Sequence, residues 1–126
     1  MNKFGIIIIS FTLLILAMGA FFLTKPAKPV QIPERDKSSY EYFWGNGCPH
    51  CAKVQEFIDS WNKKDTIKIT KYEVWYNKDN AQIMQNRYDS CPKNSVGSSI
   101  AVPLLITPDG KCFMGDEPII NHLKSI

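Results

Sequence analysis

The segment that most constrains this chain is Cys48-Pro49-His50-Cys51, in which two cysteines lie three residues apart. It follows an aromatic run, 40–44, that is typical of a buried strand, and it opens a stretch with apolar residues at helical spacing. Two cysteines at a helix start can close a small disulfide ring or open to a dithiol. The helix terminus favours the thiolate of the first cysteine, because unpaired backbone N–H groups point at it. The motif therefore predicts redox chemistry at a strand–helix junction.

An uncharged apolar stretch covers residues 5–23. As a helix rising ~1.5 Å per residue it reaches about 28 Å, close to the ~30 Å hydrocarbon core of a bilayer. We predict a transmembrane anchor or signal-anchor within residues 1–24. A cleaved signal peptide and a secreted product are the alternative, with Ala17-Met18-Gly19 as the cleavage site. Cleavage there leaves the apolar segment 21–23 at the mature N-terminus, which favours the anchor.

Two features of the sequence predict opposite sides of the membrane for the rest of the chain. Basic residues after the apolar stretch outnumber Lys3 before it, which by the positive-inside rule favours a cytoplasmic domain. A short N-terminal tail before a single apolar segment is instead typical of a signal-anchor, and four cysteines fit an oxidising compartment. We predict a single-pass cell-membrane protein with an extracytoplasmic domain. The basic residues after the stretch are Lys25, Lys28, Arg35 and Lys37.

Composition divides the rest of the chain into two parts. Residues 25–38 are rich in proline and lysine and lack periodicity, which indicates a linker. Residues 39–126 are enough for one small core. The net charge of +3 and the scattered lysines exclude a nucleic-acid footprint. Periodicity predicts a strand at 40–44, a helix from Pro49, a strand centred on 72–75, a helix capped by Asp79 and ending at Tyr88, a polar loop 89–99, strands at 102–107 and 111–114, and a final helix after Gly115-Asp116.

This order of elements, with the cysteine pair at the first strand–helix junction and a proline opening the third strand, resembles the thioredoxin superfamily in its minimal, glutaredoxin-sized form. The resemblance covers residues 39–126. Phe43-Trp44 resembles thioredoxins, and the Pro-His dipeptide between the cysteines resembles the DsbA-type disulfide oxidases. The resemblance implies an α/β, thioredoxin-like fold: a mixed four-stranded sheet in the order βαβαββα with helices on both faces. One N-terminal transmembrane helix precedes it here.

The helical phase predicts different environments for the two cysteines of the motif. Cys51 shares the apolar face of the helix with Val54 and is expected in the core, whereas Cys48 lies at the helix tip within reach of a partner. We therefore expect Cys48 to be the nucleophile and Cys51 its resolving partner. A static disulfide and half of a zinc site are the alternatives. His50 is expected to stabilise the Cys48 thiolate, and Pro49 suits a first helical turn, where its missing N–H is not needed.

The resemblance also implies roles for residues outside the motif. Pro103 corresponds to a cis-proline that faces the cysteine pair, and Val102 to a residue whose backbone docks an incoming peptide; an ordinary strand-start proline is the alternative. One position departs from the superfamily, which often carries a buried acid six residues before the first cysteine. Tyr42 stands there, and strand alternation turns Glu41 to the other face. Proton transfer to the buried thiol is left to water, Glu73 or no dedicated group.

The two remaining cysteines, Cys91 and Cys112, lie 21 residues apart. We predict that they form a structural disulfide, which by loop entropy stabilises the fold by about 3 kcal/mol. Free thiols and a second redox pair are the alternatives. The spacing of the four cysteines is poor for a zinc site, so no metal is predicted.

These features predict a membrane-tethered thiol–disulfide oxidoreductase that acts on protein cysteines outside the cytoplasm, as an oxidase or isomerase. A glutathione-dependent reductase is one alternative, because Gly115-Asp116 resembles the glutathione-binding end of glutaredoxins. A non-catalytic module that binds a metal or partner is another. The sequence carries no cofactor motif, so the resemblance implies a membrane redox partner that recycles the cysteine pair.

Overall fold

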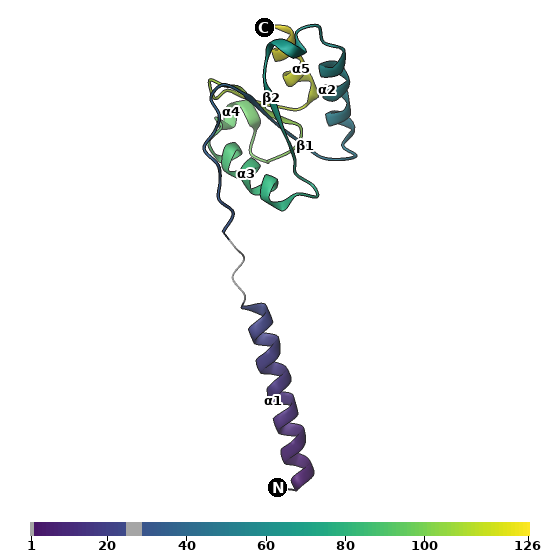
Figure 1. Ribbon diagram of the computed structural model, residues 1–126, viewed down its shortest axis with the longest axis vertical. Helices are drawn as coiled ribbons and strands as arrows, with labels where there is room; N and C mark the ends of the chain where they lie inside the picture. The colour runs from purple at the N-terminus through teal and green to yellow at the C-terminus, as the bar shows by residue number, and fades with distance from the viewer. Residues whose placement is uncertain (1, 25–28) are drawn as a thin grey trace.

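The computed structural model describes residues 2–24 and 29–126 (Figure 1). Helix α1 (Lys3–Leu23) stands apart from the globular part in Figure 1, and none of its residues is buried. It is long and apolar enough to cross a membrane, with a mean hydropathy of 2.8. A helix that is apolar all round and uncovered by protein is typical of a membrane span. Residue 1 of the predicted anchor and residues 25–28 of the predicted linker lie outside the described residues.

The globular part contains a mixed four-stranded sheet in the order β2-β1-β3-β4. β1 and β2 pair in parallel, while β3 is antiparallel to both β1 and β4. This architecture confirms the predicted α/β fold and the predicted order of its main elements. The elements after α1 are β1 (Tyr40–Trp44), α2 (Pro49–Ser60), a 3-10 turn η1 (Lys64–Thr66), β2 (Ile69–Glu73), α3 (Lys78–Asp89), α4 (Lys93–Val96), β3 (Leu104–Ile106), β4 (Cys112–Met114) and α5 (Asp116–Lys124).

Helices cover both faces of the sheet, as predicted. Successive side chains of a strand point to opposite faces, so Tyr42 and Phe43 of β1 enter different cores. Tyr42 packs in a cluster with residues of α2 and α5, and Phe43 packs in a cluster with residues of α3 and α4. Figure 1 shows α2 and α5 side by side, away from α3 and α4. Burying β1 on both faces explains why four of its five residues are aromatic; the exception, Glu41, pairs with Arg87 of α3.

Two expectations for the second strand and the third helix are corrected. β2 ends at Glu73, so the strand is centred earlier than 72–75, because the Glu73 carboxylate accepts the backbone N–H groups that follow and turns the chain. α3 is capped by Asn77 rather than Asp79. The Asn77 side chain accepts the N–H groups of Asp79 and Asn80 at 3.1 Å, which asparagine does well at an N-cap.

The region after α3 also differs in detail. The segment 89–99, predicted as a loop, contains the short helix α4, which Pro92 precedes and Gly97 ends. The third strand is shorter than the expected 102–107, because pairing with β1 extends only over Leu104–Ile106. Val102 and Pro103 therefore lie just before β3 rather than within it.

The chain upstream of β1 packs on the globular part. Ile32 lies against the Phe43 cluster, and the Arg87 Nη2 atom donates to the Pro33 carbonyl oxygen at 2.8 Å. The Arg35 guanidinium donates to the carbonyl oxygen of Thr107 at 2.8 Å. Part of the segment 25–38 is therefore held against the domain by arginine side chains, and packing begins upstream of Ser39.

Candidate functional site

The cysteine motif lies in the tight connection between β1 and α2. Cys48 is the N-cap of α2 and Pro49 is its first residue, where a missing N–H is tolerated. Gly47 has a φ of 88°, in the left-handed region that favours glycine. The ring of Trp75 occupies the place that a Cβ at Gly45 would take, so this loop accepts a side chain at neither position without rearrangement.

Cys48 and Cys51 form a disulfide with a Cα–Cα distance of 5.2 Å. The backbone N–H of Cys51 donates to Cys48 Sγ at 3.2 Å. After reduction, the same donor and the other N–H groups of the first turn point at the Cys48 sulfur and favour its thiolate. The geometry therefore suits a cysteine whose anion is stabilised by a helix terminus.

The two cysteines differ less in burial than the sequence predicted. Cys51 is 3% exposed, in agreement with its position on the apolar face of α2. Cys48 is only 6% exposed, although it was expected at an open helix tip. In the disulfide its sulfur is bonded to Cys51 and accepts the Cys51 N–H, so it faces the first turn of the helix. Cys48 also lines part of an adjacent pocket.

A pocket of about 560 Å³ borders the disulfide. Both cysteines contribute to its wall, together with two aromatic residues and two polar side chains of α2 and β2. These four are Tyr42, Trp44, Gln55 and Lys71. The residues that line it include neither Val102 nor Pro103, so the pocket is distinct from the docking position that the resemblance implies.

His50 is held by a carboxylate from a distant part of the chain. Its Nδ1 atom lies 3.0 Å from Asp116 Oδ1, and Lys53 Nζ lies 3.1 Å from Asp116 Oδ2. These two contacts lower the pKa of Asp116 to about 2. The structure thus brings His50 to Asp116, whereas the sequence predicted an interaction of His50 with the Cys48 thiolate. In the sequence, Gly115-Asp116 indicated only a resemblance to glutaredoxins. No local pattern pairs Asp116 with the cysteine motif.

We expect Asp116→Asn to make the Cys48–Cys51 pair more oxidising. The substitution removes a negative charge bonded to the first turns of α2, where the thiolate forms, and frees His50 and Lys53 to face that thiolate. A tenfold change in the equilibrium with glutathione corresponds to about 30 mV. The measurement is the equilibrium potential of the full chain in glutathione buffers. Glu117→Gln, an exposed neighbour on α5, is the matched control. A lower potential for Asp116→Asn, or an equal shift in the control, contradicts the expectation.

The segment before β3 also reaches the α5 end of the site. The Val102–Pro103 peptide bond is cis, as the resemblance implies. The backbone N–H of Gly115 donates to the Pro103 carbonyl oxygen at 2.9 Å. Gly115 precedes Asp116, so one short segment contacts both the residue before β3 and the cysteine motif. Substrate docking by Val102 and Pro103 stays a prediction.

None of Tyr42, Glu41 and Glu73 is free to carry the proton of the buried Cys51 thiol. The Tyr42 hydroxyl donates to the Cys51 carbonyl oxygen at 3.3 Å, and burial raises the pKa of this phenol. Glu41 faces the opposite side of the sheet, as predicted, and pairs with Arg87. Burial alone raises the pKa of Glu73, but backbone hydrogen bonds from Asn46 and from the 75–77 turn outweigh it and lower that pKa. The Glu73 carboxylate therefore stabilises the loop that contains Asn46 and the turn at residues 75–77.

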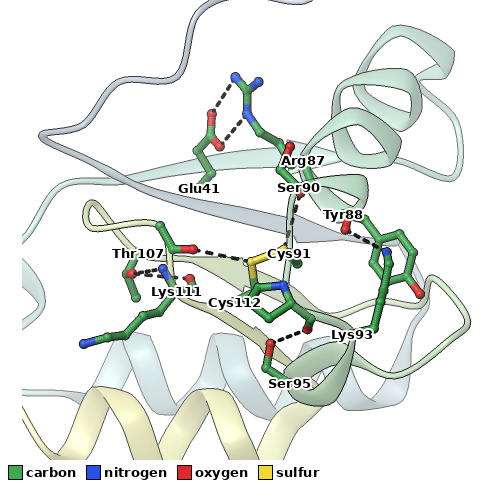
Figure 2. The surroundings of a disulfide bond; sticks show 12 residues. Glu41, Arg87, Tyr88, Ser90, Cys91, Lys93, Ser95, Thr107, Lys111 and Cys112 are labelled. Carbon is green, nitrogen blue, oxygen red and sulfur yellow. Dashed lines mark hydrogen bonds and ion pairs between the residues drawn. A yellow bond between two sulfur atoms is a disulfide. The ribbon is translucent and has the colours of Figure 1, made fainter.

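Cys91 and Cys112 form a second disulfide, with a Cα–Cα distance of 5.9 Å (Figure 2). Both residues are buried. Figure 2 shows the sulfurs between the end of α3 and the β-hairpin, near Thr107 and Lys111. The bond ties the segment after α3 to the first residue of β4 and closes a ring that contains α4 and β3. This placement suits a structural cross-link.

No protein-family model and no curated protein matches the chain. A search of solved structures finds a crystal structure of a mutant thioredoxin-like protein, 21% identical, with a TM-score of 0.49. The match covers 69% of this chain and 96% of the other. The sheet order, the disulfide at the start of α2 and the cis-proline before β3 are those of the thioredoxin-like fold that the sequence predicted.

Proposed function

We propose that this chain exchanges disulfides with cysteines of other proteins through Cys48 and Cys51, as an extracytoplasmic oxidase or isomerase. The observation that carries the proposal is the disulfide at the start of α2, with the Cys51 N–H directed at Cys48 Sγ and a pocket beside both residues. A static cross-link does not need a helix terminus that stabilises its thiolate or an adjacent pocket. A redox pair uses both.

The oxidation of a substrate dithiol proceeds in two exchanges. A substrate thiolate attacks Cys48 Sγ, the Cys48–Cys51 bond breaks, and Cys51 leaves as a thiolate that takes a proton. A second substrate thiolate then attacks the substrate sulfur of the mixed disulfide and expels the Cys48 thiolate. The substrate loses two electrons and gains a disulfide, while the protein becomes a dithiol. A membrane redox partner that accepts these electrons completes the cycle.

The environment favours Cys48 as the leaving thiolate of the second exchange. Each unit by which a thiol pKa is lowered corresponds to about 1.4 kcal/mol in favour of the reduced protein, or about 30 mV for a two-electron couple. The N–H groups at the start of α2 supply this stabilisation. We also propose that Val102 and Pro103 dock the substrate backbone, as the resemblance implies.

The proposed location is the outer side of a membrane. All four cysteines are present in disulfides, which persist in oxidising compartments. α1 has the length and composition of a membrane span. We propose that α1 is a single-pass anchor and that the globular part faces away from the cytoplasm.

The test is transfer of a disulfide to a reduced, unfolded protein. The full chain in detergent, oxidised at Cys48–Cys51, is mixed with a substrate that has two thiols. The free thiols of protein and substrate are then alkylated, and the masses of both molecules are measured by mass spectrometry. We expect one substrate disulfide for each protein molecule reduced. A Cys91→Ala/Cys112→Ala variant is expected to transfer equally, because that pair is structural. Turnover of glutathione without oxidation of protein thiols contradicts the proposal and favours a glutathione-dependent reductase.

A further inference from the structure

We propose that the pocket beside the Cys48–Cys51 disulfide binds an apolar side chain of a client protein, and that an acidic residue of the client lies next to that side chain. The preferred substrates are then protein thiols flanked by aspartate or glutamate. This inference rests on the proposed function and specifies its substrate class. The occupant is an extended segment of a client polypeptide that carries the reacting cysteine.

The size and walls of the pocket fit such a segment. Its volume of about 560 Å³ lies within the range of about 300–1,000 Å³ that is typical of ligand sites. Trp44, Pro49 and Ala52 supply apolar surface. Because Cys48 and Cys51 form part of the same wall, a client side chain in the pocket places its neighbouring thiol near the Cys48 sulfur.

The charge of the pocket favours client segments that carry an acidic residue. Among the described residues that line it, Lys71 is the one charged side chain. β1 and β2 pair in parallel with Tyr42 opposite Lys71, which places both on the face of the sheet that α2 covers. Lys71 Nζ donates to the neutral Gln55 Oε1 at 2.8 Å. This hydrogen bond holds the ammonium group at the pocket without neutralising its charge.

Among the residues that the structure describes, no carboxylate lines the pocket, and the acidic residues around it have other partners. Asp59 Oδ1 accepts from Gln55 Nε2 at 2.6 Å, so the Gln55 amide lies between this carboxylate and Lys71. The Glu73 carboxylate accepts four backbone N–H groups, from Asn46 and from residues 75–77. Asp116 binds His50 and Lys53. The pocket lining therefore combines apolar surface with one positive charge and no carboxylate, which is electrostatically complementary to an apolar segment that carries a carboxylate.

The expected preference is modest and depends on salt. Exposed ion pairs change binding by a small factor, so we expect a client cysteine flanked by glutamate to react about three- to fivefold faster than one flanked by lysine. Charges at the rim of an interface act mainly on the rate of association, which salt lowers. The advantage is therefore expected to disappear in high salt.

The test compares two peptides that each carry a cysteine and an adjacent phenylalanine and differ only in a flanking glutamate or lysine. Second-order rate constants for their reaction with the oxidised full chain in detergent are measured at low and high salt. Lys71→Gln is expected to abolish the preference, and Lys71→Glu to reverse it. Lys64→Gln removes the same charge from an exposed lysine in η1, outside the pocket, and is expected to keep the preference.

The outcomes separate this inference from the proposed function. Equal rates for the two peptides with the native chain overturn the inference and leave disulfide exchange intact. A preference that survives in Lys71→Gln, or is lost equally in Lys64→Gln, also overturns the inference. No reaction with either peptide or with a reduced protein overturns the proposed function. The redox potential of each variant is measured alongside, and a potential that shifts enough to explain the rates contradicts a binding role for Lys71.

Discussion

Replacing Cys48 by serine is expected to lower disulfide exchange with protein thiols by roughly 10³-fold or more, because the sulfur that forms the mixed disulfide is removed. Cys51→Ser is expected to behave differently. Its Cys48 thiolate, still at the start of α2, attacks a client disulfide but has no neighbouring thiol to release the product. The variant therefore accumulates mixed disulfides between Cys48 and its clients.

The measurement is a non-reducing gel after rapid alkylation, with peptide mass spectrometry to identify the linked cysteines. The two variants are matched, because each removes one sulfur from the same disulfide ring. Cys48→Ser is expected to give no mixed disulfide through Cys51, which lies in the first turn of α2 on its buried face. Accumulation of adducts on Cys51, or exchange at the native rate in Cys48→Ser, contradicts the assignment of the nucleophile.

Replacing Arg87 by leucine is expected to destabilise the globular part by about 3–5 kcal/mol. Arg87 Nε donates to Glu41 Oε2 at 2.9 Å, and both side chains are nearly inaccessible to solvent. Loss of the arginine leaves the Glu41 carboxylate buried without its counter-charge and releases the Pro33 carbonyl oxygen. Because domains are stable by only about 5–15 kcal/mol, the loss is a large share of the total.

Urea unfolding of the oxidised full chain in detergent measures the change. The double variant Glu41→Leu/Arg87→Leu is expected to recover most of the loss, because an apolar pair carries no buried charge. Lys68→Ala breaks the exposed Lys68–Asp36 pair and is expected to have a much smaller effect, since solvent screens it. A destabilisation as small as that of Lys68→Ala shows that the buried pair does not contribute as proposed.

Elements whose signals are local were predicted accurately. The aromatic run 40–44 forms β1 over the same residues, because a strand buried on both faces favours apolar side chains at most positions. Pro49 starts α2 for a local reason as well, since a proline at this position lacks only an N–H that the helix does not use. The spacing of Cys51 and Val54 predicted the buried face of α2.

Elements that depend on competing side chains were predicted less well. Asp79 and Asn77 are both good N-caps by type, and the structure uses Asn77, whose side chain reaches two backbone N–H groups. The end of β2 depends on Glu73, which binds the turn that follows instead of serving as a proton carrier. Local periodicity does not distinguish these choices.

The sequence by itself determined the motif, the order of the elements and the apolar N-terminal helix, because neighbouring residues encode backbone conformation and periodicity. Only the tertiary structure decided which side chains meet. Asp116 lies 66 positions from His50, and Arg87 lies 46 positions from Glu41. Such contacts depend on how the strands pair and where α5 and α3 pack on the sheet. The same packing places Lys71 of β2 at the pocket beside the Cys48–Cys51 disulfide.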